Sequence, residues 1–169
     1  MTLPVSEESP FRHEAADDSP GFLLWKLTTL WRNRVLLALE PFGLTQTQYA
    51  ILASLRWFED HDQRPTQSLL VEHTKMDKMT LSKAIRRLEA AGLVSRRSAP
   101  RDARATQVRS TTRGQRVTAR AVEAVEDADE AFFDGLDATR LDTWRSLTND
   151  LITQHAPRTP DQTRAQPRR

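Results

Sequence analysis

Apolar residues recur at helical spacing in six segments of the chain. These segments cover about 19–40, 46–58, 67–74, 78–91, 113–134 and 137–154. An apolar position every three or four residues predicts an amphipathic helix. The first segment has apolar residues on more than one face: Leu23, Leu24, Leu27, Leu30, Trp31, Val35, Leu36 and Leu39. A helix with so wide an apolar arc is buried on two sides, and we expect the second side to contact another subunit.

Polar residues mark where several of these helices begin. A capping residue precedes four of them: Ser19 before Pro20, Thr45 in a capping box with Gln48, Thr111 or Thr112, and Asp137. Such side chains accept hydrogen bonds from the free amides of the first helical turn. Gly92 follows the fourth segment, where a left-handed residue commonly ends a helix.

A helix-turn-helix is predicted in the middle of the chain. The short helix 67–74, a three-residue turn and the longer helix 78–91 have its order and spacing. After Gly92 the pattern changes to strands at 93–98 and 105–110, joined by the basic loop 99–104. We expect this hairpin to form a wing and to be the only sheet.

The predicted fold class is therefore mainly α with a small β-hairpin wing, that is, a winged helix-turn-helix with an α-helical dimerisation region. We expect a flexible tail (1–18), a first dimerisation helix (19–40) and a winged helix-turn-helix domain (41–112). Within that domain, the recognition helix is expected at about 78–91 and the wing at about 93–110. C-terminal dimerisation helices (113–155) and a disordered basic tail (156–169) should follow.

Charge is distributed very unevenly, although the net charge is only +2. Residues 75–120 carry thirteen Lys and Arg against three acids, a net charge of +10, whereas residues 121–155 have a net charge of −7. A block this basic, placed over the helix-turn-helix and the wing, suits a DNA phosphate backbone. A solvated basic surface is the alternative on charge alone.

Several other classes of protein are not expected. The chain has no glycine-rich phosphate loop and no nucleophile elbow, so we predict no enzyme and no cofactor. It has no cysteine, and its four histidines lack metal-ligand spacing, so no metal site is expected. No apolar run is long enough for a membrane span, and the acidic N-terminus does not resemble a signal peptide, which favours a cytoplasmic protein without membrane contact.

Three segments resemble the MarR family of bacterial regulators in order and spacing. They are 43–52 (GLTQTQYAIL), 88–94 (LEAAGLV) and 101–114 (RDARATQVRSTTRG), and the resemblance extends over about 22–152. Ser110 departs from the family pattern, which usually has leucine there. The resemblance implies a homodimer whose end helices intertwine and whose two winged domains bind a pseudo-palindromic operator on double-stranded DNA.

Candidate DNA-binding residues lie on the recognition helix and the wing. The N-terminal half of the helix supplies candidates for base contacts: Lys78, Met79, Thr80, Ser82 and Lys83. Arg86 and Arg87 suit phosphate contacts, although an internal ion pair is an alternative for Arg87. In the wing, the family resemblance assigns Arg104 to a minor groove and Asp102 to orienting it. Further phosphate candidates are Arg96, Arg97 and Arg101, of which the first two cannot both face DNA because strand side chains alternate.

The resemblance further implies a transcriptional regulator, specifically a repressor released by a small aromatic effector. Candidate walls of an effector pocket are Trp25, Trp31, Tyr49, Trp57 and Phe58, although core or dimer packing explains these residues as well. The alternative function is an architectural or protein-interaction module with a winged helix and no ligand response.

Overall fold

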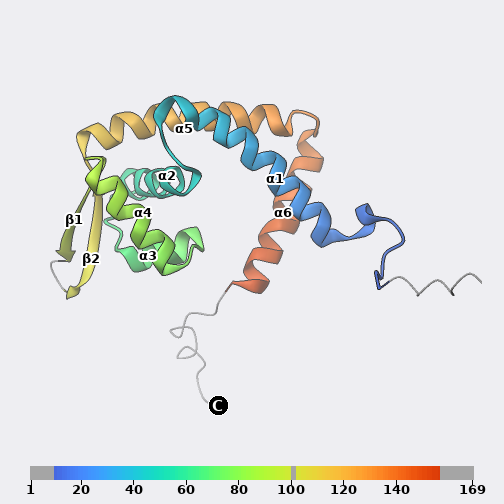
Figure 1. Ribbon diagram of the computed structural model, residues 1–169, viewed down its shortest axis with the longest axis horizontal. Helices are drawn as coiled ribbons and strands as arrows, with labels where there is room; N and C mark the ends of the chain where they lie inside the picture. The colour runs from blue at the N-terminus through green and yellow to red at the C-terminus, as the bar shows by residue number, and fades with distance from the viewer. Residues whose placement is uncertain (1–9, 100–101, 157–169) are drawn as a thin grey trace, which may run out of the picture.

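The computed structural model describes residues 10–99 and 102–156, without the side chains of 102–104. This part of the chain contains six α-helices and one β-hairpin (Figure 1). The helices are α1 (Pro20–Leu39), α2 (Gln46–Asp60), α3 (Gln67–Thr74), α4 (Lys78–Ala90), α5 (Thr112–Phe133) and α6 (Ala138–His155). The strands are β1 (Val94–Ala99) and β2 (Asp102–Ser110), and two short 3₁₀ turns, η1 (Ala16–Asp18) and η2 (Glu40–Phe42), flank α1. The predicted fold class is confirmed.

Side-chain caps begin the helices where the sequence predicts them. Ser19 accepts from the Phe22 amide at 3.4 Å, Thr45 and Gln48 form the reciprocal capping box, Thr111 accepts from the Gly114 amide at 3.0 Å, and Asp137 accepts from the Arg140 amide at 2.9 Å. Gly92 has φ +68° after α4, in the left-handed conformation expected of it. These local signals fix where the helices begin and end, because each cap pairs a backbone group that the helix itself leaves free.

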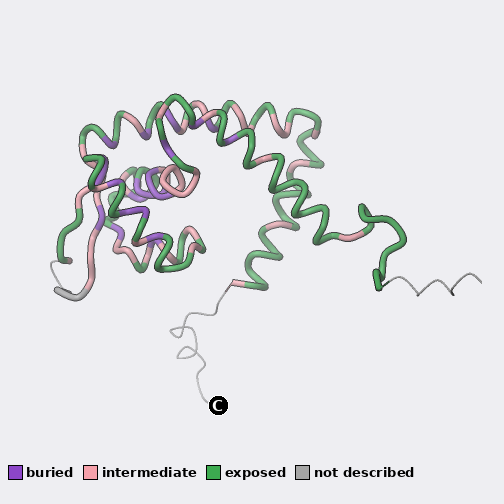
Figure 2. Tube along the Cα trace, in the orientation of Figure 1, coloured by how far each residue is buried: buried purple, intermediate pink, exposed green. Residues whose placement is uncertain are grey.

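The core lies between the helix-turn-helix, the wing base and α5 (Figure 2). Helices α2, α3 and α4 each turn leucine or isoleucine side chains inward, and α5 and the last turn of α1 close the core from outside. Its fully buried large side chains include Val35, Leu39, Ile51, Leu52, Leu55, Leu70, Leu81, Ile85, Leu88 and Val108. This packing holds the second helix of the helix-turn-helix, α4, against a fixed support.

The wing occupies the predicted residues, but its second strand is longer than predicted, and its strands are not the only paired segments. The expected loop 99–104 is mostly strand, since β1 runs to Ala99 and β2 begins at Asp102. The strands pair antiparallel, with an irregular register after Ser98. Thr66 adds an isolated antiparallel bridge to Gln107, and Pro65 accepts a hydrogen bond from the Val108 amide at 3.1 Å. The segment before α3 therefore extends the hairpin on one edge, which its short polar sequence does not reveal.

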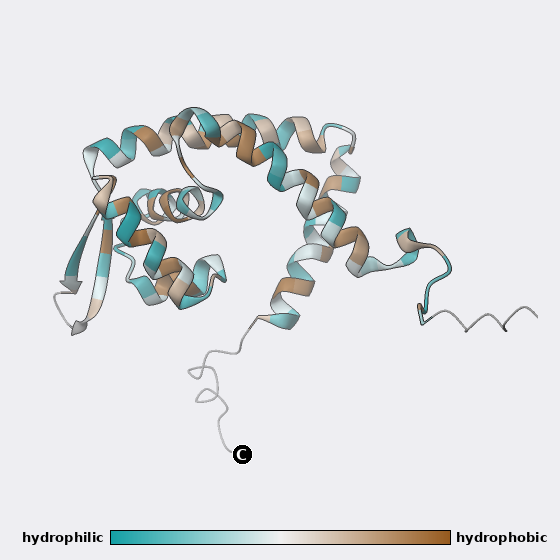
Figure 3. Cartoon of the chain, in the orientation of Figure 1, coloured by the Kyte–Doolittle hydropathy of each residue, from teal (hydrophilic) through white to brown (hydrophobic). Residues whose placement is uncertain are grey.

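Two arms project from this domain. The N-terminal half of α1 and all of α6 extend away from the winged part of the molecule (Figure 1), and both carry apolar bands along their length (Figure 3). Helix α6 has no buried residue, and its Trp144 contacts Phe133 at the end of α5. The exposed large apolar side chains of the whole of α1 and α6 are Phe22, Leu23, Leu24, Trp25, Leu27, Leu30, Leu36, Leu37, Trp144, Leu147, Leu151 and Ile152. Among the helices described, none is long and apolar enough to cross a membrane.

Candidate nucleic-acid interface

Helix α4 begins at a capped, exposed end. Asp77 is its N-cap and accepts a hydrogen bond from the Thr80 amide at 2.8 Å. Hydrogen bonds from Thr80, first from its side chain and then from its backbone, lower the pKa of Asp77 below its usual value. Lys75, two residues before Asp77, has φ +57°, a left-handed conformation that ends α3 without glycine. The cap and the left-handed turn together set the direction in which α4 leaves the helix-turn-helix.

The two faces of α4 are chemically different. Leu81, Ala84, Ile85 and Leu88 are buried, which confirms the predicted core face. The other face carries the predicted DNA-contacting residues of this helix: Lys78, Met79, Thr80, Lys83, Arg86 and Arg87, all exposed, and the half-buried Ser82. Six of these line one shallow hollow, from Lys78 to Arg86.

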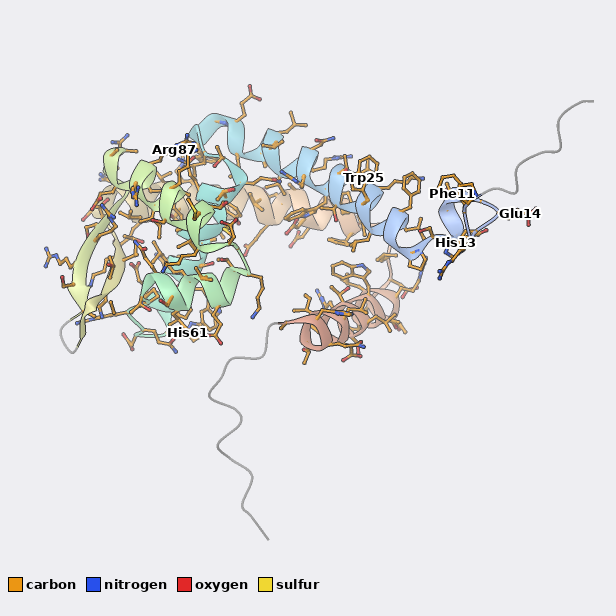
Figure 4. The ribbon with its side chains drawn as sticks, turned by 60° about the horizontal axis from the view of Figure 1, so that its bottom comes forward. Phe11, His13, Glu14, Trp25, His61 and Arg87 are labelled. Atoms are coloured by element: carbon orange, nitrogen blue, oxygen red, sulfur yellow. The ribbon has the colours of Figure 1, made fainter. Side chains whose placement is uncertain are left out.

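The basic side chains of this face have no internal counter-charge. Within the described residues, Lys78, Lys83, Arg86 and Arg87 take part in no ion pair. Arg87, whose position is labelled in Figure 4, thus has no ion-pair partner among the described residues. Four unneutralised cations on one exposed face attract a polyanion.

The wing is tied to α4 by an ion pair. The Arg96 guanidinium of β1 lies 2.6 Å from the Glu89 carboxylate of α4, and this partner lowers the pKa of Glu89. Arg96 is therefore paired within the domain, whereas Arg97, the next residue of the strand, has no ion-pair partner among the described residues; both are exposed. Of the other wing candidates, Arg101 lies outside the described residues, and so do the side chains of Asp102 and Arg104, whose backbone belongs to β2.

The base of the wing is closely packed against the start of α5. Gly114 lies so near the Leu93 carbonyl that a Cβ atom at this position would stand 1.9 Å from its oxygen. The Thr111 hydroxyl donates to the carbonyls of Gly92 and Leu93, and Arg113 donates to Ala91 at 3.0 Å. Residues 111–114 therefore join α5 to the end of α4 and to the first strand of the wing.

Aromatic and acidic residues meet where α1, α2 and α5 come together. The Trp31 indole N–H donates to the Asp129 carboxylate at 2.6 Å. The pKa of Tyr49 is raised to about 12, mainly by burial and then by the negative charges of Asp129 and Glu126. Both rings also pack against the core. This junction links the arm formed by α1 to the winged domain.

The five aromatic residues predicted to line an effector pocket are not brought together. Trp57 and Phe58 lie at the other end of α2, where Trp57 stacks on His61 with ring centroids 4.3 Å apart. Trp25 stacks on Phe22 of the α1 arm, and Figure 4 shows it far from His61. Helical spacing by itself separates Tyr49 from Trp57, because residues eight apart on α2 stand about 12 Å apart along the helix axis.

Three features of the site were missed in the sequence. Asp77 was assigned to the turn, although an aspartate just before an apolar-periodic segment is a typical N-cap signal. The Glu89–Arg96 pair joins a helix to a strand, and no local pattern predicts such a contact. The left-handed Lys75 has no sequence signal, because lysine is not typical of that conformation.

Comparison with known proteins gives consistent matches over the same elements. The family model described as the ArnR1-like winged-helix domain matches residues 40–129. The chain is 38% identical over 116 residues to the HTH-type transcriptional regulator YdcH of Bacillus subtilis, which covers 68% of this chain and 78% of that protein.

Solved structures give the same assignment. A MarR-family transcriptional regulator from Rhodococcus sp. RHA1 superposes with a TM-score of 0.72 at 25% identity, covering 82% of this chain and 96% of that one. CouR from Rhodococcus jostii RHA1, crystallised with p-coumaroyl-CoA, superposes with a TM-score of 0.74 at 26% identity, covering 87% of this chain and 99% of that one.

Proposed function

The chain carries an ArnR1-like winged-helix domain and belongs to the MarR family of DNA-binding transcriptional regulators, and from that premise we propose that it is a homodimeric repressor released by a small aromatic effector. Each winged domain inserts α4 into a major groove of double-stranded DNA, and the dimer binds a pseudo-palindromic operator. One observation carries the proposal: the exposed, uncompensated basic face of α4 opposite its buried stripe.

The start of α4 is the part we assign to reading bases. Thr80 and Ser82 offer hydroxyl groups that can donate to or accept from base edges, and Lys78 and Lys83 suit the acceptors of guanine. Met79 is 82% exposed, which suits an apolar contact with a thymine methyl. Arg86 and Arg87 stand further along the helix and suit phosphate contacts, which position the protein and carry little sequence information.

The wing supplies the second contact in this proposal. Arg104 enters the minor groove beside the operator, Asp102 orients its guanidinium, and Arg97 and Arg101 contact phosphates. Arg96 serves a different purpose, because its ion pair with Glu89 fixes the angle between the wing and α4. The wing and α4, which contact the same half-site in this proposal, are thus held in a constant relative position.

The arms support the proposed homodimer. Soluble monomers rarely expose a continuous apolar patch of more than a few hundred Å², and twelve large apolar side chains of α1 and α6 are exposed in the single chain. A second copy supplies the matching apolar surface, since the same two helices project from it. Two copies also double the phosphate contacts at a palindrome.

For the effector we propose the junction of α1, α2 and α5, with Trp31 and Tyr49 as the aromatic contacts. Those two residues lie where an arm meets a winged domain, so a ligand there would change the spacing of the two α4 helices. The structure of CouR with p-coumaroyl-CoA supports an aromatic ligand by analogy. Trp25, Trp57 and Phe58 lie elsewhere and are left out of the proposed pocket.

Selection of bound sequences from random DNA by the full chain tests the proposal. We expect an inverted-repeat site bound about a thousandfold more tightly than random DNA. Thr80→Ala and Lys83→Ala should change the selected bases, while Arg104→Ala should weaken binding to the same site. Arg56→Ala removes a cation from α2, where Arg56 pairs with Asp60, and serves as the control. An unchanged base profile in both α4 variants would contradict the assignment of that helix.

A further inference from the structure

A second cavity lies at the base of the wing, on elements that the proposed DNA contacts and effector junction do not use. It has a volume of about 460 Å³ and is bordered by the end of α2, the segment before α3, β2 and the start of α5. Its polar lining includes Glu59, Asp62, Arg64, Arg109 and Gln115. This size falls within the range of small-molecule sites, about 300–1,000 Å³.

Arg109 is the unusual residue of this cavity. Its Nε atom is buried and has no hydrogen-bond partner, and its guanidinium takes part in no ion pair within the described residues. A buried donor without a partner costs free energy, and a charged donor costs more than a neutral one. Native proteins rarely keep such a group unless something outside the chain pairs with it.

A second arginine, Arg64, lines the same cavity. The Thr66–Gln107 bridge and the hydrogen bond from the Val108 amide to Pro65 fix an antiparallel register. Continued by two residues, this register places Arg64 opposite Arg109, and both line the cavity. Like charges directly opposite each other on neighbouring strands destabilise the pairing. An anion between the two guanidinium groups would remove that repulsion.

The two acidic residues of the cavity form no ion pair with these arginines in the described part of the chain. Glu59 accepts hydrogen bonds from the Ser110 amide at 2.9 Å and from the Gln115 side chain at 3.5 Å, so it braces the wing base. Asp62 has a left-handed backbone, with φ +54°, and forms no ion pair in the described structure. The lining therefore has two arginines on the strand segments, the Glu59 carboxylate held against Ser110 of β2, and Asp62 on the turn after α2.

We infer that this cavity binds a small organic carboxylate, held by Arg109 and Arg64. A carboxylate matches the planar fork of a guanidinium and can pair with it through two parallel hydrogen bonds. The Asp62 carboxylate of the lining suits a ligand that carries a hydrogen-bond donor at its other end. Because Pro65 and Val108 join the two arginine-bearing segments, the ligand would brace β2 against the segment that leads into α3. The inference does not depend on which DNA the protein reads.

Thermal unfolding of the full chain tests this site, with sodium citrate, sodium L-glutamate and sodium benzoate as probes and sodium chloride at matched ionic strength as reference. A ligand that binds the folded state raises Tm in a saturable way. We expect such a rise with at least one probe, together with slower hydrogen exchange of the Val108 amide. Chloride should produce neither effect.

Two variants localise the effect. Arg109→Gln and Arg64→Gln should each weaken the apparent affinity of the active probe by about tenfold or more, because each removes a charge-assisted contact. Arg64 is exposed, so its variant tests the site even where Arg109→Gln folds poorly. Arg56→Gln, on α2 outside the cavity, should retain the wild-type response. If no probe exceeds chloride at millimolar concentration, or if Arg64→Gln responds as wild type does, the inference is wrong.

Discussion

Tyr49 shows how one side chain reports the state of the whole junction. It is the single tyrosine of the chain. It lies on α2, close to the acidic residues Asp129 and Glu126 of α5. Burial disfavours the phenolate, and the neighbouring negative charges of Asp129 and Glu126 disfavour it further. The hydroxyl therefore stays protonated through the whole physiological range and offers a permanent hydrogen-bond donor to the proposed effector.

We predict that the folded protein ionises Tyr49 at about pH 12. Tyrosinate absorbance near 295 nm measures the titration, and the same protein in guanidinium chloride should titrate near the ordinary value of about 10. The unfolded chain loses this proton first as pH rises, so stability decreases between about pH 10 and 12. Tyr49→Phe should lose that part of the pH dependence. A folded midpoint near 10 would contradict the burial described here.

Gly114 is a second residue whose identity is set by its surroundings. We predict that Gly114→Ala destabilises the protein by about 3 kcal/mol, the upper part of the range for overpacking, because the added Cβ meets the Leu93 carbonyl rather than a flexible side chain. Urea unfolding followed by circular dichroism measures the loss. Gly135→Ala is the control, since a Cβ there has no atom within 4 Å. Equal stability of the two variants would count against the close contact.

At the scale of single elements, the sequence predicted helices well and the wing less well. Helix ends follow from caps and apolar period, and both are local properties that the sequence displays. The Thr66–Gln107 bridge and the Glu89–Arg96 pair depend on how separate elements meet. The five aromatic candidates for an effector pocket are spread over several places for the same reason: Trp57 lies on α2 and Trp31 on α1, but which residues share a junction is decided by packing.

Helix α4 offers a test in which a cap and a charge can be separated. We predict that Asp77→Ala lowers Tm and weakens DNA binding, because the first turn of α4 loses the acceptor for the Thr80 amide. Asp77→Asn keeps a good capping side chain and removes a negative charge close to the proposed DNA surface, so it should retain Tm and bind DNA at least as well as the wild type.

The same residue gives a pH dependence with a defined sign. The pKa of Asp77 is lowered in the folded state, so its contribution to stability is present above the unfolded value and is lost as pH falls through the folded value. Thermal unfolding between pH 6 and pH 2 should show this loss in the wild type and not in Asp77→Asn. If Tm fell equally with pH in the two proteins, protonation of Asp77 would not be coupled to folding.

At the scale of the whole molecule, the winged domain forms a buried core within one chain, whereas the two arms leave apolar surface exposed. The winged domain buries its own core, whereas α6 buries no residue and α1 buries only Val35 and Leu39. The sequence predicted a second covered face for α1 from its wide apolar arc. It could not predict that α6 stands so far from the rest of its own chain, because an apolar stripe does not specify what covers it.

The arms therefore provide the test of assembly. We predict that Leu147→Glu converts the protein from dimer to monomer, because a carboxylate would be buried without a partner in the subunit interface. Leu147 is 60% exposed in the single chain, so the winged domain should keep its circular dichroism. Asn149→Glu places the same charge two residues away, on the other side of α6, and is the matched control. Sedimentation velocity at micromolar concentration distinguishes the two variants.

The monomer should also bind the operator much more weakly and with a smaller dependence on salt, because each lost phosphate contact reduces the slope of log K against log salt by about 0.9. A Leu147→Glu protein that sediments as a dimer would show that α6 is not the interface, and the apolar band of α1 would then need another partner.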